Sequence, residues 1–148
     1  MASPTPETLR LTLPSDTAYL HLVTNLCKNA ARVAGLDAAG ADQVALATDE
    51  ALTNVIVHAY GGERGHEIEL AFEILPDCLE IHVIHDGVPL DESKLPPKFD
   101  PVRLIESRRK GGIGIVLMRR LMDRVDFRTT PDRRNECCLR KNKPAVGA

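Results

Sequence analysis

Residues 67–74 and 79–84 alternate apolar and polar side chains, which is the pattern of half-buried β-strands. The apolar positions of the first segment are Ile68, Leu70, Phe72 and Ile74. Pro76 and Asp77, two residue types common in turns, separate the segments. The sequence therefore predicts an antiparallel hairpin with one buried face, which a second layer of structure must cover.

The chain before the hairpin begins with another alternating segment and continues with a helical one. Residues 9–13 predict a first strand, which Pro14 ends. Ser15 or Asp16 is expected to cap a helix that stops at Gly35. The apolar stripe expected to face the core consists of Tyr19, Leu22, Val23, Leu26, Ala30 and Val33.

A second helix is predicted from Asp37 to about His58, and its two faces differ in chemistry. The side expected to pack into the core carries Val44, Ala51, Leu52, Val55 and Ile56. The side expected to face away from the core carries Gln43, Ala47, Glu50, Asn54 and His58. Because Glu50 and Asn54 are four residues apart, they lie one helical turn apart on one face.

The Glu50 and Asn54 pair has a catalytic interpretation and a plain one. A carboxylate in a partly desolvated pocket can act as a general base. A carboxamide oxygen is a suitable ligand for Mg²⁺, which prefers oxygen donors. Taken alone, however, the same pattern is more typical of a solvated helix face.

The second hairpin strand ends in the polar sequence His85-Asp86-Gly87, which could lie at the mouth of a pocket. The alternation of side chains along a strand places His85 on the helix side of the sheet and Asp86 on the opposite side. A tight turn that contains a glycine explains the sequence equally well.

An irregular, proline-rich segment runs from residue 86 to about residue 110, and residues 111–114 (GGIG) then lead into a helix through Met122. Glycines at a helix N-terminus let a phosphate approach backbone N–H groups. The motif lacks the GK[ST] of a Walker loop, and such glycines often serve only flexibility. Two short strands, at residues 125–129 and 136–140, complete the chain.

These elements predict an α+β fold: a two-layer sandwich in which a mixed, mostly antiparallel sheet carries three helices on one face. We expect one domain over residues 9–141, with flexible ends at 1–8 and 142–148. The net charge of −2 and the 3% aromatic content weigh against direct nucleic-acid binding. With no secretion signal and no apolar stretch near the roughly 18 residues that span a bilayer, we expect a cytoplasmic protein without a membrane partner.

The four cysteines, Cys27, Cys78, Cys137 and Cys138, form no CxxC pair and have no histidine at zinc-ligand spacing. Cys137 and Cys138 are adjacent, so on a strand they point to opposite faces and could hardly bind one metal together. Free thiols in a reducing cytosol are therefore expected.

The order of the motifs is more specific than any one of them. Residues 47–60, residues 111–123, and Asn135 with the sequence Leu-Arg-Lys at 139–141 resemble the GHKL (Bergerat) ATP-binding fold. Within that fold the chain is most similar to the anti-sigma-factor serine/threonine-protein kinases of the RsbW and SpoIIAB type. The resemblance extends over residues 9–141 and implies ATP and Mg²⁺ as cofactors.

The resemblance also implies roles for particular residues. Glu50 would activate the hydroxyl of a serine on a partner protein, Asn54 would hold Mg²⁺, and Gly112 and Gly114 would line the phosphate site. The full set of expected cofactor-binding residues is Asn54, His85, Asp86, Gly87, Lys110, Gly111, Gly112, Ile113 and Gly114. The basic residues 108–110 could serve on a lid, although a solvated basic cluster is the more common arrangement.

One departure from the family pattern concerns adenine recognition. The family has Asp-x-Gly-x-Pro-Phe-Asp, and alignment on Gly87, Pro89 and Asp91 places its first Asp, which binds the adenine amino group, at His85. A histidine can accept a hydrogen bond through one unprotonated nitrogen but does not reproduce a carboxylate. A shifted strand end would bring Asp86 to the base instead.

Three functions are consistent with these features. The first is a kinase that binds a sigma factor and phosphorylates a serine or threonine on a STAS-type antagonist, regulating the sigma factor by partner switching. The second is an interaction module in which nucleotide tunes partner affinity or does not bind. The third is another GHKL ATPase, such as a detached histidine-kinase catalytic domain. Homodimerisation is suggested only by the resemblance.

Overall fold

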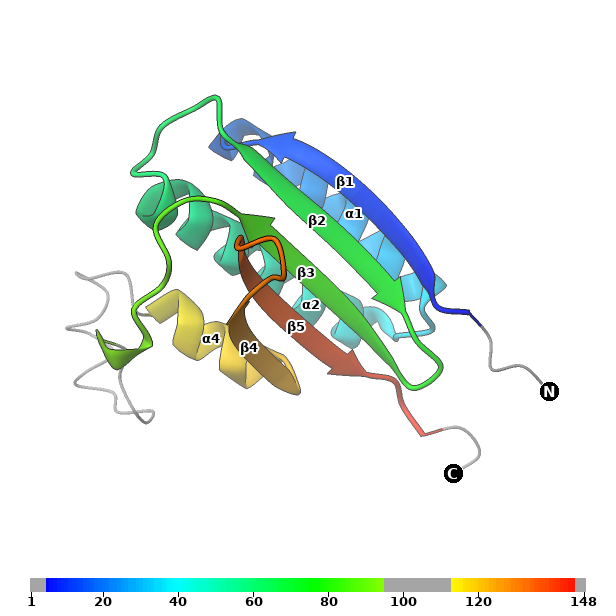
Figure 1. Cartoon of the computed structure of the whole chain (residues 1–148). Helices are drawn as coiled ribbons and strands as arrows, with labels where there is room; N and C mark the ends of the chain where they lie inside the picture. Colours follow the sequence, from blue (N-terminus) through cyan, green and yellow to red (C-terminus); the bar gives the residue numbers. More distant parts are fainter. Residues whose placement is uncertain (1–4, 95–112, 146–148) are drawn as a thin grey trace.

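The computed structural model describes residues 5–94 and 113–145 (Figure 1). Within these residues the strands form one five-stranded sheet in the order β1-β2-β3-β5-β4. The strands are β1 (Glu7–Pro14), β2 (Glu67–Ile74), β3 (Cys78–His85), β4 (Arg124–Thr129) and β5 (Asn135–Asn142). Each of the four pairings is antiparallel, so the sheet is simpler than the mixed one that we expected.

The helical layer covers one face of the sheet, as predicted (Figure 1). Its members are η1 (Thr17–Tyr19), α1 (Leu20–Val33), α2 (Ala38–Asn54), the π-helical turn η2 (Val55–Ala59) and α4 (Ile113–Leu121). A further short 3-10 helix, η3 (Glu92–Lys94), follows β3 and lies away from the sheet (Figure 1). The core lies between the layers, where Leu52 of α2 and Met118 of α4 are fully buried with Phe72 of β2 and Leu139 of β5. The predicted two-layer α+β sandwich is therefore confirmed.

Local capping explains where the first two helices begin and end. Asp16 accepts a hydrogen bond from the backbone N–H of Ala18 at 2.9 Å, and Asp37 accepts one from Gly40 at 2.8 Å. Gly35 ends α1 with a φ of +94°, a conformation that glycine adopts readily. These observations confirm the helix boundaries predicted from sequence.

The apolar stripe predicted for α1 is partly wrong. Val23 and Ala30 are buried, but Leu22 and Val33 are 65% and 71% exposed. The buried side of α1 instead includes the small residues Cys27 and Ala31. Small side chains let α1 pack closely on α2. The sequence prediction favoured the larger apolar residues and therefore placed the stripe too far from this side.

The described residues contain no helix of the length and apolarity that crossing a membrane requires. The four cysteines are free and buried, in agreement with the expectation of unpaired thiols.

Candidate active site

The functional end of α2 is marked by a change of helix type. The α-helix ends at Asn54, and the next five residues form a π-helical turn in which Tyr60 N–H donates to Val55 O at 3.0 Å. π-Helical turns are rare and occur frequently at functional sites. The helix predicted to reach His58 is thus confirmed in extent, but its last turn is wider than an α-helix.

The π-helical turn docks on the segment that follows β3. The backbone N–H of Val88 donates to Ala59 O at 2.9 Å. A Cβ at Gly87 would lie 2.7 Å from the same oxygen, so only glycine permits this approach. Asn135 donates from Nδ2 to Gly87 O at 2.9 Å and holds the segment from the side of β5. The end of α2 and the end of β3 are thereby fixed to each other.

Glu50 and Asn54 lie beneath the first turn of α4. A Cβ at Gly114, the second residue of α4, would lie 2.6 Å from Glu50 Oε2 and 3.6 Å from Asn54 Oδ1. Gly114 is itself buried, so its missing side chain leaves the space that the Glu50 carboxylate occupies. The tertiary structure therefore brings together three residues that the sequence analysis had selected from two distant motifs.

This arrangement corrects the prediction that the polar side of the second helix faces away from the core. Ala47 is fully buried, and Glu50 and Asn54 are half-buried. The reason is that α4 packs against this side of α2, which the periodicity of α2 alone could not reveal.

The electrostatics of the pair suit a proton acceptor beside a polar ligand. Burial raises the pKa of the Glu50 carboxyl, and the nearby charge of Asp49 raises it further. The amide nitrogen Nδ2 of Asn54 is buried and has no hydrogen-bond partner among the described residues. A buried amide without a partner is uncommon, and a bound polar group would satisfy it. The site is therefore chemically suited to an oxygen-rich ligand with an associated Mg²⁺ ion.

His85 is the last residue of β3 and is buried, whereas Asp86 follows the strand and is exposed, in agreement with the predicted strand parity. His85 is 9% exposed, whereas Asp86 is exposed and accepts a hydrogen bond from Tyr60 Oη at 2.7 Å. That hydrogen bond is the main reason why the pKa of Asp86 is lowered. Asp86 is thus already paired with Tyr60, and the alternative of a shifted strand end does not occur.

The hydrogen bonding of His85 determines which of its nitrogens is available. The backbone N–H of Gly87 donates to His85 Nδ1 at 3.2 Å. Burial lowers the pKa of His85, so its ring is neutral at physiological pH. A neutral imidazole whose Nδ1 accepts a hydrogen bond carries its proton on Nε2. The nitrogen left for a ligand is therefore a donor rather than an acceptor.

Lys110, Gly111 and Gly112 lie outside the described residues, as does most of the irregular segment before them. Ile113 begins α4, so the prediction that the glycine motif leads into a helix is confirmed, and the second half of the motif forms the first turn of that helix.

Two residues that hold the site received no role from sequence reasoning. Tyr60 connects the end of α2 to both hairpin strands, because its hydroxyl donates to Asp86 Oδ1, accepts from the Asp86 N–H at 3.1 Å and lies 3.1 Å from Glu67 O. Asn135 holds Gly87 from β5. Both lie inside the motifs that resemble the GHKL fold, which was the available signal, but only their three-dimensional contacts reveal what they do.

Comparison with known proteins identifies the class of protein that this fold and site define. The histidine kinase-like ATPase domain matches residues 13–141. The chain is also 30% identical over 122 residues to the protein named Serine-protein kinase RsbW of Listeria innocua, covering 80% of this chain and 78% of that one. The proteins of the same name from Halalkalibacterium halodurans and Bacillus velezensis are 29% and 28% identical over 126 and 121 residues. These alignments cover 83% and 79% of this chain, and 76% and 75% of the relatives.

The chain therefore belongs to the histidine kinase-like ATPase domain family and, within it, to the RsbW-type serine-protein kinases.

Proposed function

We propose that this chain is an anti-sigma factor and serine/threonine-protein kinase that uses Mg-ATP to phosphorylate a STAS-type antagonist. In this proposal the chain binds either a sigma factor or the antagonist, and phosphorylation of the antagonist changes which partner is bound. Such a circuit operates in the cytoplasm, because a sigma factor acts on RNA polymerase. The family membership and the RsbW name of its relatives support this proposal.

The observation that carries the proposal is the packing of Gly114 over the Glu50 and Asn54 pair. The buried, unpartnered amide of Asn54 and the space left by Gly114 form a polar cradle between α2 and α4. A solvated helix face, the plain alternative for these two residues, would show neither burial nor an unpartnered amide. Both features support a site prepared for a ligand.

Within this proposal, each residue has a role that its surroundings favour. Bound Mg-ATP would supply the phosphoryl group and neutralise charge during transfer. Asn54 would hold Mg²⁺ through Oδ1, and Glu50 would accept the proton of the partner's serine hydroxyl. The raised pKa of Glu50 makes it a stronger base than an ordinary carboxylate, which favours that transfer. The N-terminal turn of α4, with Gly111 and Gly112 before it, would receive the phosphates, and Lys110 would add a positive charge.

The proposed contact to the nucleotide base passes through His85 rather than Asp86. Because Nε2 of His85 carries the proton, we expect it to donate to an acceptor on the base. It would not accept a hydrogen bond from the adenine amino group. Gly87, at the same end of β3, would let the backbone approach the nucleotide closely. Residues 9–141 would form the complete nucleotide-binding domain.

The second candidate is an interaction switch that binds partners without transferring phosphate. The observation that favours it is the same neutral His85, since loss of a carboxylate at this position weakens selection for adenine. Against it stands the presence of both Glu50 and Asn54 in one half-buried cradle.

Incubation with γ-labelled ATP, Mg²⁺ and STAS-type proteins encoded near the gene tests the proposal directly. We expect label on a serine or threonine of one antagonist, and no label with the Glu50→Gln variant. If Mg-ATP raises the melting temperature but no partner is labelled, the interaction switch is the better description. If millimolar Mg-ATP causes no shift, both the kinase and a switch tuned by nucleotide are excluded.

A further inference from the structure

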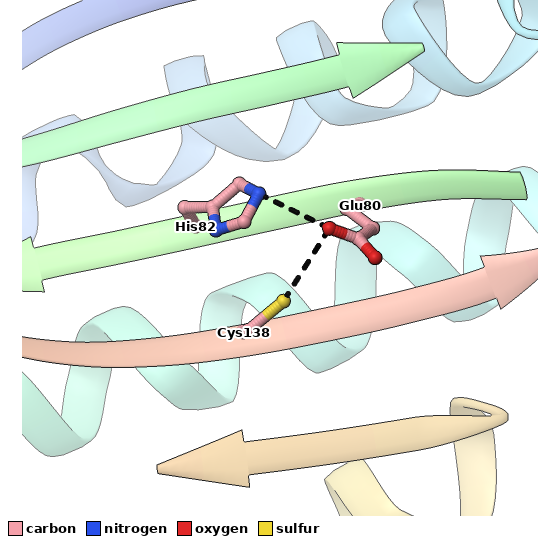
Figure 2. Close-up of side chains that lie close together, drawn as sticks. All are labelled: Glu80, His82 and Cys138. Atoms are coloured by element: carbon pink, nitrogen blue, oxygen red, sulfur yellow. Dashed lines mark hydrogen bonds and ion pairs between the residues drawn. The ribbon is translucent and has the colours of Figure 1, made fainter. Parts of the chain in front are cut away.

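The sheet face opposite the helices carries a compact group of metal-ligating side chains (Figure 2). Glu80 and His82 lie on β3, and Cys138 lies on β5 as the direct cross-strand partner of His82. One ligand atom from each residue lies within 4.8 Å of the other two. Glu80 Oε2 is 3.4 Å from His82 Nε2 and 3.9 Å from Cys138 Sγ, so it sits between them.

These separations are close to those of a tetrahedral zinc centre. Zinc binds nitrogen and oxygen at about 2.0–2.2 Å and sulfur at about 2.3 Å, so neighbouring ligand atoms are roughly 3.3–3.8 Å apart. Small rotations of the three side chains would bring their ligand atoms to that spacing. Thiolate, imidazole and carboxylate are all zinc ligands.

Neighbouring residues already orient the ligand atoms toward one point. Glu136 Oε1 lies 3.1 Å from His82 Nδ1, where it would accept the Nδ1 proton of a histidine that binds metal through Nε2. Arg128 holds the other oxygen of Glu136. Arg140 binds Glu80 Oε1 at 2.9 Å and leaves Oε2 facing the cluster. This is the outer support that metal-binding histidines and carboxylates usually have.

Two carboxylate oxygens surround Nε2 of His82. Besides Glu80, Glu73 Oε2 lies 3.2 Å from the same nitrogen. An imidazole lone pair that faced two carboxylate oxygens would be repelled by both. The cluster is also well shielded, since the His82 side chain is 13% exposed and Cys138 is 5% exposed. Low exposure strengthens both the repulsion and any attraction for a cation.

We propose that Glu80, His82 and Cys138 bind a zinc ion on this face, with Glu73 or a water molecule as the fourth ligand. The site is separate from the Glu50 and Asn54 cradle, so it does not depend on the kinase proposal. The competing arrangement is a metal-free network in which the His82 ring is hydrogen-bonded to the surrounding carboxylates.

The thiol of Cys138 must lose its proton when the metal binds. Burial, and then the charge of Glu80, raise the pKa of Cys138 to about 12, so the metal-free site holds a thiol. Zinc binding would therefore displace that proton and form a thiolate. Carboxylates outnumber guanidinium groups in this cluster: Glu73, Glu80 and Glu136 against Arg128 and Arg140. The cluster therefore carries a net negative charge before the metal binds.

Cobalt substitution in the whole, chelator-treated chain tests the proposal on the unmodified protein. One equivalent of Co²⁺ should produce a sulfur-to-cobalt charge-transfer band and intense tetrahedral ligand-field bands, and one equivalent of Zn²⁺ should remove both. Absence of the charge-transfer band, or bands that do not saturate at one equivalent, would overturn the site and leave the metal-free hydrogen-bond network as the explanation.

A matched cysteine pair provides the control, because Cys137 is adjacent but faces the helices. Cys138→Ser should lose the charge-transfer band and weaken zinc binding by about 100-fold or more, above the usual effect of an outer residue. Cys137→Ser should change neither. Equal zinc affinity in the two variants would contradict the proposal.

Further variants keep the test decisive if Cys138→Ser does not fold, which circular dichroism will show. Glu136→Gln should keep the charge-transfer band but weaken zinc binding by about 10-fold or more, because it supports His82 from outside. His66→Gln removes an exposed histidine that pairs with Glu63, and should leave zinc binding unchanged. Equal affinity of Glu136→Gln and the unaltered chain, or weakening by His66→Gln, would assign the binding elsewhere.

Discussion

Gly114 of α4 lies so close to Glu50 of α2 that a Cβ on the glycine would be 2.6 Å from the Oε2 oxygen of the carboxylate. Real Cβ atoms do not approach an oxygen this closely, so a side chain at residue 114 would have to displace Glu50. The glycine thus determines where the proposed catalytic base can lie. This contact joins the two motifs on which the functional interpretation depends.

The Gly114→Ala variant tests that contact. The added methyl group should push the Glu50 carboxylate aside and lower phosphate transfer by about 10-fold to 100-fold, since small misplacements of a catalytic group are costly. Stability should change little, because alanine favours a helix over glycine by about 0.8–1.0 kcal/mol and offsets the displacement. Transfer assays and thermal melts measure the two effects.

Gly40→Ala is the matched control for this variant. It adds a methyl group to another helical glycine, where the new atom meets Asp37 at the start of α2. Transfer should be unchanged in this control. Unchanged transfer in Gly114→Ala as well would show that the position of Glu50 is not critical.

Glu50→Gln should abolish transfer while preserving ATP binding. It should also raise the melting temperature at neutral pH: because burial raises the folded-state pKa of Glu50, its ionised form opposes folding above that pKa. For the same reason, as the pH is lowered, transfer by the unaltered chain should begin to fall at a higher pH than it would with a base of ordinary carboxylate pKa. Rates measured across acidic pH test this.

Asp49→Asn is the companion variant for the pH profile. Removing the charge of Asp49 should lower the pKa of Glu50 and move the acidic fall in rate to lower pH. An unmoved profile, or undiminished transfer by Glu50→Gln, would mean that Glu50 is not the base.

Asn54→Ala should remove the thermal stabilisation by Mg-ATP without harming the ligand-free protein, because the Asn54 amide has no partner among the described residues. In the unaltered chain that stabilisation should reach about 2.7 kcal/mol at a ligand concentration of about 100 times Kd. Gln43→Ala, about three turns earlier on α2, should keep the full response. A full response in Asn54→Ala would remove this residue from the magnesium site.

His85→Asp should tighten ATP binding and increase the preference for ATP over ITP by about 10-fold, the effect of roughly one hydrogen bond. The carboxylate can accept from the adenine amino group, whereas the Nε2–H of His85 suits a carbonyl acceptor. Asp86→Asn is the control and should leave both affinities unchanged. The opposite result, with only Asp86→Asn altering nucleotide affinity, would place Asp86 at the base.

Tyr60→Phe should destabilise the fold by about 1 kcal/mol, because the hydroxyl donates to Asp86 Oδ1 and accepts from the Asp86 N–H. The folded-state pKa of Asp86 is lowered mainly by Tyr60, so this stabilisation is present above about pH 4 and declines at lower pH. The difference in melting temperature between the two proteins should therefore shrink on acidification. A constant difference across pH would show that the Asp86 carboxylate is not involved.

Much of the fold could be predicted because its signals are local. The alternation in residues 67–84, the caps at Asp16 and Asp37, and the stop at Gly35 each depend on neighbours within a few positions. The candidate site followed from the resemblance, which supplied roles that local chemistry left open. Strand parity alone also predicted that His85, rather than Asp86, is buried.

Contacts between distant segments could not be predicted in this way. The burial of Ala47 and the half-burial of Glu50 depend on α4, which lies more than sixty residues further along the chain. The exposure of Leu22 likewise depends on how closely α1 packs against α2. Helical periodicity defines the faces of a helix, but only packing decides which face becomes buried.

The side-chain cluster around His82 also combines features that the sequence predicts with a contact that only the fold creates. By itself the sequence determined that residues 80 and 82 share one face of a strand, and that Cys137 and Cys138 point to opposite faces. The sequence showed no recognisable zinc-ligand motif, because Cys138 is 56 residues from His82. Only the antiparallel register of β3 and β5 places the two side by side. Periodicity is encoded by neighbouring residues, whereas the pairing of strands is decided by how the whole sheet buries its apolar face.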